Sequence, residues 1–288
     1  MKLFIKYRIR ILQITNFFIY LDNYSVSYYF SRFGNNLQQI ALGILYTQKV
    51  GGNYYNKDHP RVQNFSIINK PVSNYFSLLK QHYRFFYFKD QKDFPLNKVD
   101  TNYILENIEE TFKHFIRPNI NFLEELTVPE DTLVIHIRSG DIFDIPITSY
   151  FQNPINYYQK LIENYEKVIL VTSEEKNNPV IGKLLKESNV TLHSSSVEQD
   201  FNLLVNAVNL ATSGVGTFPI AAALLSKKLK NFYYTNLFSE EHLNPQMILD
   251  KKVTHHQYTV QESYKKDYLN KKNPTSLILD DGVKVYKN

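Results

Sequence analysis

Short apolar runs alternate with helical segments from residue 133 to residue 235, and this alternation restricts the fold more than any other feature of the sequence. Leu133, Val134 and Ile135 form a continuous apolar run, which is typical of a parallel strand buried on both faces. We predict further strands over residues 167–171, 190–193, 210–212 and 231–235. Strands and helices that alternate at this spacing predict a Rossmann-like α/β unit, a parallel sheet with helices on both faces.

The helices between these strands carry recognisable start signals. Asn153-Pro154 and Asn178-Pro179 each place Asn at the N-cap and Pro at the first helical position, where Asn can accept a free backbone N–H and Pro already has a helical φ. We expect further helices over residues 200–208 and 219–226, the second of them directly after a glycine-containing loop.

The first half of the chain offers one clear unit of the same kind. Residues 25–30 alternate as a strand does, and the segment Arg32-Phe33-Gly34-Asn35-Asn36 follows them. The residues after this segment carry an apolar stripe at helical spacing, formed by Leu37, Ile40, Ala41, Ile44 and Leu45. A polar, proline-containing break at residues 128–131 separates the halves, so we predict two Rossmann-like domains over residues 1–129 and 130–288, the second with a C-terminal tail.

Composition narrows the possible chemistry. The 288 residues include no Cys, which excludes disulfides, thiolate nucleophiles and Cys-ligated metal sites. The net charge of +5 is a mild excess with both signs interleaved, which fits an anionic small ligand or an anionic membrane surface. No nucleic-acid-binding module is recognisable, so we expect no nucleic-acid partner.

The N-terminus allows two interpretations. Residues 1–10 are basic and residues 11–21 are mostly apolar, as at the start of a signal peptide or a short anchor. Polar residues interrupt this run, and it is shorter than the ~20 apolar residues that a spanning helix needs. The sequence favours a first buried element, with peripheral membrane association as the alternative. We therefore expect a cytoplasmic or membrane-peripheral protein rather than one with a Golgi-type anchor.

Polar side chains gather where predicted parallel strands end, which is where open α/β sheets bind ligands. His136, Arg138, Gly140 and Asp141 directly follow the strand at 133–135. An Arg at this position needs an anion, and its guanidinium can hold a diphosphate with two parallel hydrogen bonds. The alternative is a structural Arg138–Asp141 pair that closes a loop.

Two further segments have the same potential. Gly34 and Asn35 begin a helix, and the residues from Ser213 to Thr217 and Phe218 form a glycine loop before another, so both offer free amide groups to a phosphate. Thr172 also follows a strand end and is a weaker candidate for contact with a nucleoside. The alternative for each segment is ordinary turn chemistry.

Metal and hydrolase chemistry find no support in the sequence. The pair His255-His256 is interpreted as a surface feature, because no partner at metal-ligand spacing accompanies it. No Asp-x-Asp that would hold a divalent ion and no nucleophile turn of the Gly-x-Ser-x-Gly type occurs. We expect neither a metal nor a cofactor.

The motifs resemble those of a known enzyme superfamily. His-x-Arg-x-Gly-Asp, found here at residues 136–141, is the signature of the α1,2-, α1,6- and protein O-fucosyltransferases. Residues 32–36 are similar to the Arg-Phe-Gly-Asn-Gln of protein O-fucosyltransferases. Residues 200–218 are similar to the family's Asp-led helix followed by Ser/Thr-Ser/Thr-Phe. The three matches occur in the family's order.

The resemblance implies roles for individual residues. Arg138 would bind the β-phosphate of GDP-fucose with support from His136 and Asp141, and Asn35 would lie beside the donor phosphates and the acceptor hydroxyl. Among the other matching positions, Ser213 and Thr217 would touch the β-phosphate and Asp200 would lie near the nucleoside, with Phe218 completing the motif. Asn36 stands where the family has Gln, Gly216 is extra and a Trp-Trp pair is lacking, so the α1,2 linkage is not indicated.

The resemblance also implies an overall reaction. We expect a GT-B-like enzyme whose two Rossmann-like domains face a central cleft, residues 1–129 on the acceptor side and residues 130–288 binding the donor. It would move L-fucose from GDP-fucose to a glycan hydroxyl with inversion and without a metal, with Asp141 or His136 as the base. Three alternatives stay open: another nucleotide sugar, a non-catalytic glycan- or nucleotide-binding protein, and a basic adaptor for nucleic acid or a membrane surface.

Overall fold

The structure is a computed structural model, and it describes residues 23–26, 29, 32–69, 81–83, 101–144, 150–174, 176–270 and 274–288. The predictions for residues 1–21 therefore lie outside the described residues, as does part of the strand predicted over 25–30. None of the helices in the described part of the chain is long and apolar enough to cross a membrane.

The second half of the chain forms a seven-stranded sheet in the order β11-β10-β9-β8-β5-β6-β7. Its strands are β5 (Thr132–His136), β6 (Lys167–Val171), β7 (Val190–His193), β8 (Asn209–Ala211), β9 (Asn231–Thr235), β10 (Thr254–Val260) and β11 (Val285–Lys287). All neighbours pair in parallel except β10 and β11, which are antiparallel. Numbered from β5, the six parallel strands have the order 3-2-1-4-5-6, which is that of a Rossmann fold.

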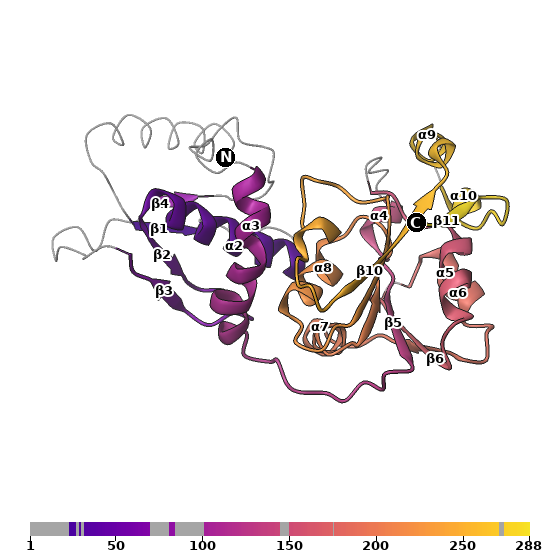
Figure 1. The fold of residues 1–288 in the computed structure, drawn as a ribbon, viewed down its shortest axis with the longest axis horizontal. Helices are drawn as coiled ribbons and strands as arrows, with labels where there is room; N and C mark the ends of the chain where they lie inside the picture. Colours follow the sequence, from indigo (N-terminus) through magenta and orange to yellow (C-terminus); the bar gives the residue numbers. More distant parts are fainter. Residues whose placement is uncertain are drawn as a thin grey trace.

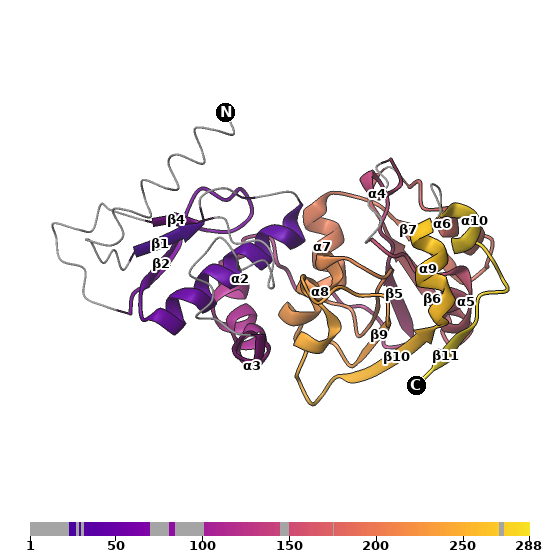
Figure 2. The same ribbon diagram turned by 90° about the horizontal axis from the view of Figure 1, so that it is seen from above.

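Helices cover both faces of this sheet, as Figures 1 and 2 show. One face carries α5 (Ile155–Ile162), α6 (Pro179–Leu184), α9 (Glu262–Asn270) and α10 (Thr275–Ile278), and the other carries α7 (Val197–Val205) and α8 (Thr217–Leu225). The alternation within β5 explains this arrangement, because Leu133 and Ile135 pack into one core and Val134 into the other. The predicted Rossmann-like α/β architecture is confirmed for this half.

One predicted helix start is confirmed and one is wrong. Asn178 caps α6 by accepting a hydrogen bond from the backbone N–H of Val180 (3.1 Å). Asn153 does not cap α5, since the N-cap residue is Pro154. The Asn153 side chain instead donates to the carbonyl of Thr212 (2.8 Å) and accepts from the hydroxyl of Thr235 (2.7 Å), so it joins strand ends across the sheet.

The first half contains a smaller sheet in the order β3-β2-β1-β4. Its strands and helices are β1 (Asn23–Val26), α2 (Phe33–Val50), β2 (Asn53–Asn56), β3 (Phe65–Ile67), β4 (Gln81–Tyr83) and α3 (Thr101–Thr111), which continues into a π-helical turn at Phe112–Ile116 and a 3-10 turn at Arg117–Asn119. β1 pairs in parallel with both β2 and β4, and β2 pairs antiparallel with β3. β1, α2 and β2 thus form one parallel crossover unit, in a sheet that is mixed rather than purely parallel.

Helix α2 is buried from Phe33 to Thr47 and joins the two halves of the chain. Its apolar side chains belong to the same hydrophobic core as α8 and as Val134 of β5. The segment that leads to β5 is also fixed, because Asn206 of α7 accepts from the amide of Leu126 (3.1 Å). The division into domains at residues 129 and 130 stays a prediction, and the core is continuous across it.

Candidate functional site

The candidate site lies where the strand order reverses, between the carboxyl ends of β5 and β8. The connections from β5 run outward to β6 and β7, whereas those from β8 run outward to β9 and β10. Loops at such a reversal diverge and leave a crevice in which α/β sheets commonly bind ligands. Residues 136–141 follow β5 and residues 212–217 follow β8, so the fold brings together two of the three segments that the sequence singled out.

Arg138 and Ser213 are joined directly. The backbone N–H of Arg138 donates to the Ser213 hydroxyl oxygen over 3.1 Å. Because that oxygen accepts, the hydroxyl hydrogen of Ser213 is available to donate to a ligand. The guanidinium of Arg138 is half-buried and lies over the ring of Tyr150, 5.2 Å from its centroid, a cation–π contact that orients it.

The loop that carries Arg138 is held by the segment after β6. Asn178 donates from its side chain to the carbonyl of Arg138 (2.9 Å), and the Asn177 side-chain oxygen accepts from the amide of Gly140 (2.6 Å). The Thr172 hydroxyl donates to the Ser139 hydroxyl over 3.0 Å. Thr172 thus holds the loop at residues 136–141 in place, whereas the sequence analysis expected it to contact a nucleoside. Asn177 and Ser139 were missed, because only the fold brings them together.

The glycine loop is fixed by the segment before α5. The amide of Val215 donates to the carbonyl of Phe151, and the amide of Asn153 donates to the carbonyl of Ser213, both over 3.1 Å. Gly214 has φ +106°, and a Cβ there would lie 2.3 Å from the Phe151 carbonyl oxygen. The loop therefore requires glycine at this position, and the Val215 amide is not free to bind a phosphate.

The third segment, at the start of α2, meets the start of α8. A Cβ on Gly34 would lie 2.7 Å from the backbone nitrogen of Phe218, so Gly34 allows two helices to touch rather than a ligand to approach. The Thr217 hydroxyl donates to the Asn35 side-chain oxygen over 2.7 Å, which uses its hydrogen. Thr217 therefore positions Asn35, and both side chains are buried.

Aromatic rings fill the space behind this contact. Phe218 lies between His136 and Phe201, with ring centroids 5.4 and 5.0 Å away. Phe33 of α2 packs edge-on against Phe201 at 5.0 Å. Phe218 and Phe201 thus connect His136, in the second half of the chain, with Phe33 of α2, in the first half.

The electrostatic environment of the site is positive. Burial lowers the pKa of His136 to about 3, and the charges of Arg138 and Arg32 add to this effect. Burial and the charge of Arg138 likewise lower the pKa of His242 to about 4. Both imidazoles are therefore neutral at pH 7, and His136 is a weak base. His242 lies in the loop after β9, close enough to Arg138 to be affected by its charge, and the sequence analysis did not identify it.

Buried polar side-chain atoms lie at the carboxyl ends of β5, β6 and β7. Val171 of β6 lies in register between His136 and His193, so these side chains share one face of the sheet. Within the described part of the chain, His136 Nδ1 and Ser173 Oγ are buried and make no hydrogen bond, and the buried His193 Nε2 lies 3.3 Å from the Asp200 carboxylate. Buried polar atoms usually have partners, so His136 Nδ1 and Ser173 Oγ indicate that ordered water or a polar ligand binds at this sheet edge.

Asp200 lies beside this row, near the start of α7. Its Oδ1 accepts from the amide of Ser195 (3.0 Å) and lies 3.3 Å from His193 Nε2. Burial raises its pKa, against the opposing effects of these two neighbours. The remaining predicted residue, Asp141, begins α4 (Asp141–Asp144), and its side chain lies outside the described part of the structure.

Comparisons of the chain with protein-family models, with characterised proteins and with solved structures found no match.

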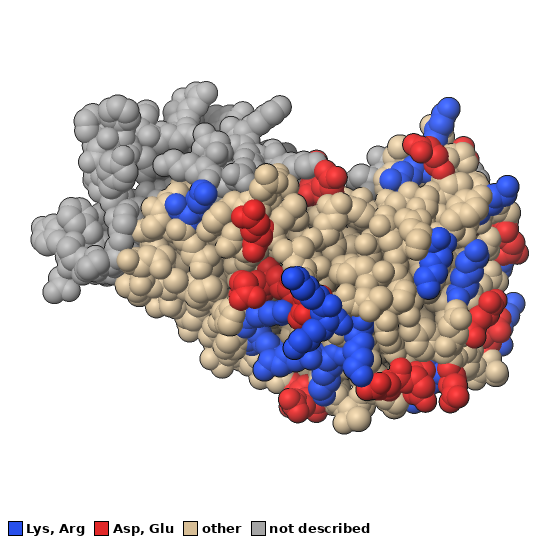
Figure 3. Space-filling model, viewed as in Figure 1, with Lys and Arg blue, Asp and Glu red and all other residues tan. Residues whose placement is uncertain are grey.

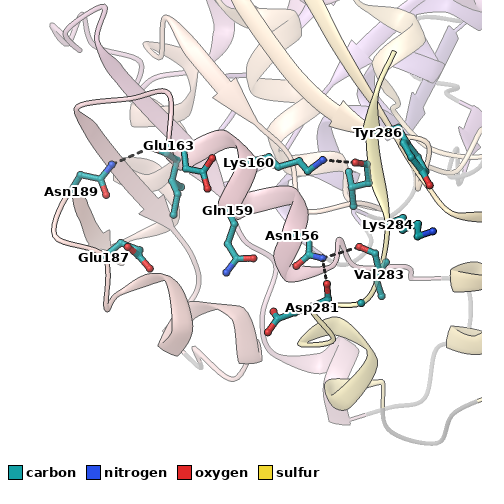
Figure 4. A pocket seen from close by; sticks show the side chains of 13 residues that line it. Asn156, Gln159, Lys160, Glu163, Glu187, Asn189, Asp281, Val283, Lys284 and Tyr286 are labelled. Atoms are coloured by element: carbon teal, nitrogen blue, oxygen red, sulfur yellow. Dashed lines mark hydrogen bonds between the residues drawn. The ribbon is translucent and has the colours of Figure 1, made fainter.

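A separate hollow of about 770 Å³ lies between α5 and the C-terminal segment. Figure 4 shows its polar side chains reaching the chain end: Asn156 donates to the carbonyls of Asp281 and Val283, and Lys160 to that of Val285 over 2.7 Å. These groups attach β11 to α5. No group of three His, Cys, Asp or Glu side chains that could hold a metal ion occurs among the described residues.

The buried histidines predict that acid destabilises the protein. The pKa of His136 is lowered to about 3, and those of His59 and His242 to about 4, from an ordinary value of 6.5. Between about pH 4 and 6.5 the unfolded chain binds more protons than the folded chain, so the free energy of unfolding decreases as the pH is lowered through this window. Each such histidine contributes up to ~1.4 kcal/mol per pH unit.

Urea unfolding at several pH values measures this slope. We expect His136→Asn to flatten it between pH 4 and 6. His114→Asn replaces a histidine whose side chain is 69% exposed and controls for the substitution itself. An unchanged slope in His136→Asn would show that His136 titrates normally.

Proposed function

We propose that the chain is an inverting glycosyltransferase that moves L-fucose from GDP-fucose to a hydroxyl group of a glycan. The observation that carries this proposal is the hydrogen bond between the Arg138 amide and Ser213 at the reversal point of a parallel sheet. It joins two of the motif segments that resemble the fucosyltransferases, and Thr217 joins the third through Asn35.

The chemistry needs positive groups at the leaving diphosphate, because negative charge develops there as the sugar departs. In this proposal the guanidinium of Arg138 binds the β-phosphate with two hydrogen bonds, held in place by Tyr150 and Asn178. The hydroxyl hydrogen of Ser213 gives a third donor. The N-terminus of α8, which has no acidic residue in its first turn, adds its dipole.

The buried polar side chains at the carboxyl ends of β5, β6 and β7 would bind the nucleoside part of GDP-fucose. A nucleoside lying along the carboxyl ends of β5, β6 and β7 would offer hydroxyl and base atoms to Ser173 and His193, with Asp200 close by. The Asp200 carboxylate is a natural acceptor for the N–H groups of a guanine base. This would give hydrogen-bond partners to His136 Nδ1 and Ser173 Oγ, which have none in the protein.

Proton removal from the acceptor is assigned to Asp141 rather than to His136. Taking a proton would make His136 a buried cation beside Arg138 and Arg32, whose charges already help to lower its pKa to about 3, whereas a carboxylate becomes neutral when it takes a proton. The neutral His136 ring packs against Phe218 and shapes the donor side of the site. We place the acceptor on the side of the first half in a GT-B-like arrangement.

Thermal unfolding with nucleotides tests the proposal. GDP at 100 times its Kd should stabilise the fold by ~2.7 kcal/mol, or raise Tm by roughly 5–10 °C, whereas UDP and CDP should do so far less. Arg138→Ala should lose this shift. GDP released from GDP-fucose in the presence of glycan acceptors then measures turnover. A shift without turnover would indicate a nucleotide-binding protein, and equal shifts with all nucleotides would contradict the donor assignment.

A further inference from the structure

A second positively charged region lies at the edge of the large sheet opposite to the candidate site. Figure 3 shows a dense group of Lys and Arg side chains at the lower centre of the molecule, with acidic side chains around it. We call it the basic patch; its members are Lys113, Arg117, Lys227, Lys228, Lys230, Lys251 and Lys252. They come from the turns after α3, from the end of α8 and from the residues before β10.

Backbone and side-chain contacts hold these residues together. Arg117 donates to the carbonyl of Leu225 at the end of α8. The amide of Thr254 donates to the carbonyl of Lys230 over 2.7 Å, which sets the start of β10 beside the start of β9. Lys113 lies 3.1 Å from Asp250, just before Lys251. The patch is therefore one continuous surface, although its residues span 140 positions in sequence.

Some of these cations are already engaged. Lys113 pairs with Glu109 at 2.7 Å, and Lys230 with Glu130 at 2.6 Å. Lys227, Lys251 and Lys252 are exposed, and their side chains form no ion pair with any described residue. Lys252 also interacts with nearby Asp250, whose pKa its charge helps to lower. Several exposed ammonium groups on one face attract a surface of negative charge more than a single anion.

Apolar side chains accompany the exposed lysines. Leu249 is 52% exposed and Leu126 is 37% exposed, which places both among the exposed large hydrophobic residues. Leu249 directly precedes Asp250 and Lys251, and the ammonium group of Lys228 donates to the carbonyl of Leu126 over 2.7 Å. Exposed leucines next to lysines are suited to the surface of a lipid bilayer, where charged headgroups border the acyl chains.

We infer that the basic patch docks the protein on an anionic lipid bilayer, with Leu249 inserted among the lipids. Lysines near such a surface each contribute to binding, and a buried leucine adds to their effect. Nucleic acid fits less well, because single strands bind through stacking on aromatic rings. Tyr286 is the only aromatic ring among the exposed large hydrophobic residues of the described part, and it lies in β11, outside the patch.

Docking would orient the candidate site away from the bilayer. The patch lies at the amino ends of β9 and β10 and the site at the carboxyl ends of their neighbours, so a five-residue strand such as β9, about 16 Å long, separates them. The inference does not depend on the proposed transferase activity, since it concerns a different surface.

Co-sedimentation of the full chain with lipid vesicles tests the inference. Vesicles with 30% phosphatidylglycerol should bind the protein at low salt, and pure phosphatidylcholine vesicles should not. Each lysine near an anionic surface is worth about fivefold in binding, so Lys227→Gln, Lys251→Gln and Lys252→Gln together should weaken partitioning about 100-fold. The control is Lys186→Gln, Lys266→Gln and Lys284→Gln, which removes the same charge from exposed positions in the turn after α6, on α9 and in the C-terminal segment.

A second variant separates a bilayer from other polyanions. Leu249→Ser should weaken vesicle binding about tenfold through the lost apolar burial, but it should leave binding to a single-stranded oligonucleotide unchanged. The inference is wrong if the patch variant and the control lose vesicle binding equally, or if neither loses it. It is also wrong if the oligonucleotide binds more tightly than the vesicles do.

Discussion

Replacing Arg138 with alanine is expected to lower kcat between about 100- and 1000-fold while the protein stays folded. Removing one preorganised group that stabilises developing charge typically costs ~3 kcal/mol of barrier. Arg138 is half-buried over Tyr150, and its loop is held by Asn178 through the backbone carbonyl, which the substitution keeps. Loss of activity should therefore come without collapse of the loop.

Turnover of GDP-fucose and the Tm of each variant together measure this effect. Arg138→Lys should recover only part of the activity, because an ammonium group lacks the planar fork that holds a diphosphate with two hydrogen bonds. Lys186→Gln, in the exposed turn after α6, controls for the change in net charge and should keep full activity. Normal turnover by Arg138→Ala would exclude Arg138 from binding the leaving group.

Gly214→Ala should give the largest loss of stability in the loops of the candidate site. Its φ of +106° strains any L side chain, and the new Cβ would lie 2.3 Å from the Phe151 carbonyl oxygen. Strain and overpacking together should cost about 3 kcal/mol, or roughly 6–12 °C in Tm. Gly34→Ala should also destabilise, because its Cβ would lie 2.7 Å from the backbone of Phe218.

Gly182 provides a matched control in the same half of the chain. A Cβ at Gly182, inside α6, would meet nothing within 4 Å. Ala is favoured over Gly in a helix by ~1 kcal/mol, so Gly182→Ala should keep Tm or raise it slightly. If Gly214→Ala unfolds at the wild-type Tm, the glycine loop moves more freely than its contacts with Phe151 indicate.

The regular half of the fold was predictable from the sequence. Strands at residues 167–171, 190–193 and 231–235 were predicted with the bounds that β6, β7 and β9 have, because each is an apolar run between helix signals. β10 was not predicted, because the strand is only partly buried and begins with the polar residues Thr254, His255 and His256, so it contains no apolar run. The mixed sheet of the first half was missed as well, because β2 and β3 are short and rich in Asn and Tyr.

The candidate site was predictable only in part, for a different reason. Motif spacing identified Arg138, Ser213 and Thr217, and the fold brings their segments together. The residues that hold them, such as Asn177 and Tyr150, lie in other loops and form no pattern with Arg138 in sequence. The role of Gly34 also became visible only in three dimensions, where the backbone of Phe218 occupies the space beside it.

The contact between α2 and α8 limits how the molecule can move. With backbone atoms of Phe218 against Gly34 and a shared apolar core behind them, the first turns of these helices cannot separate without exposing that core. Opening the two halves by a hinge at this point would therefore break the contact between Gly34 and Phe218 and the hydrogen bond between Thr217 and Asn35.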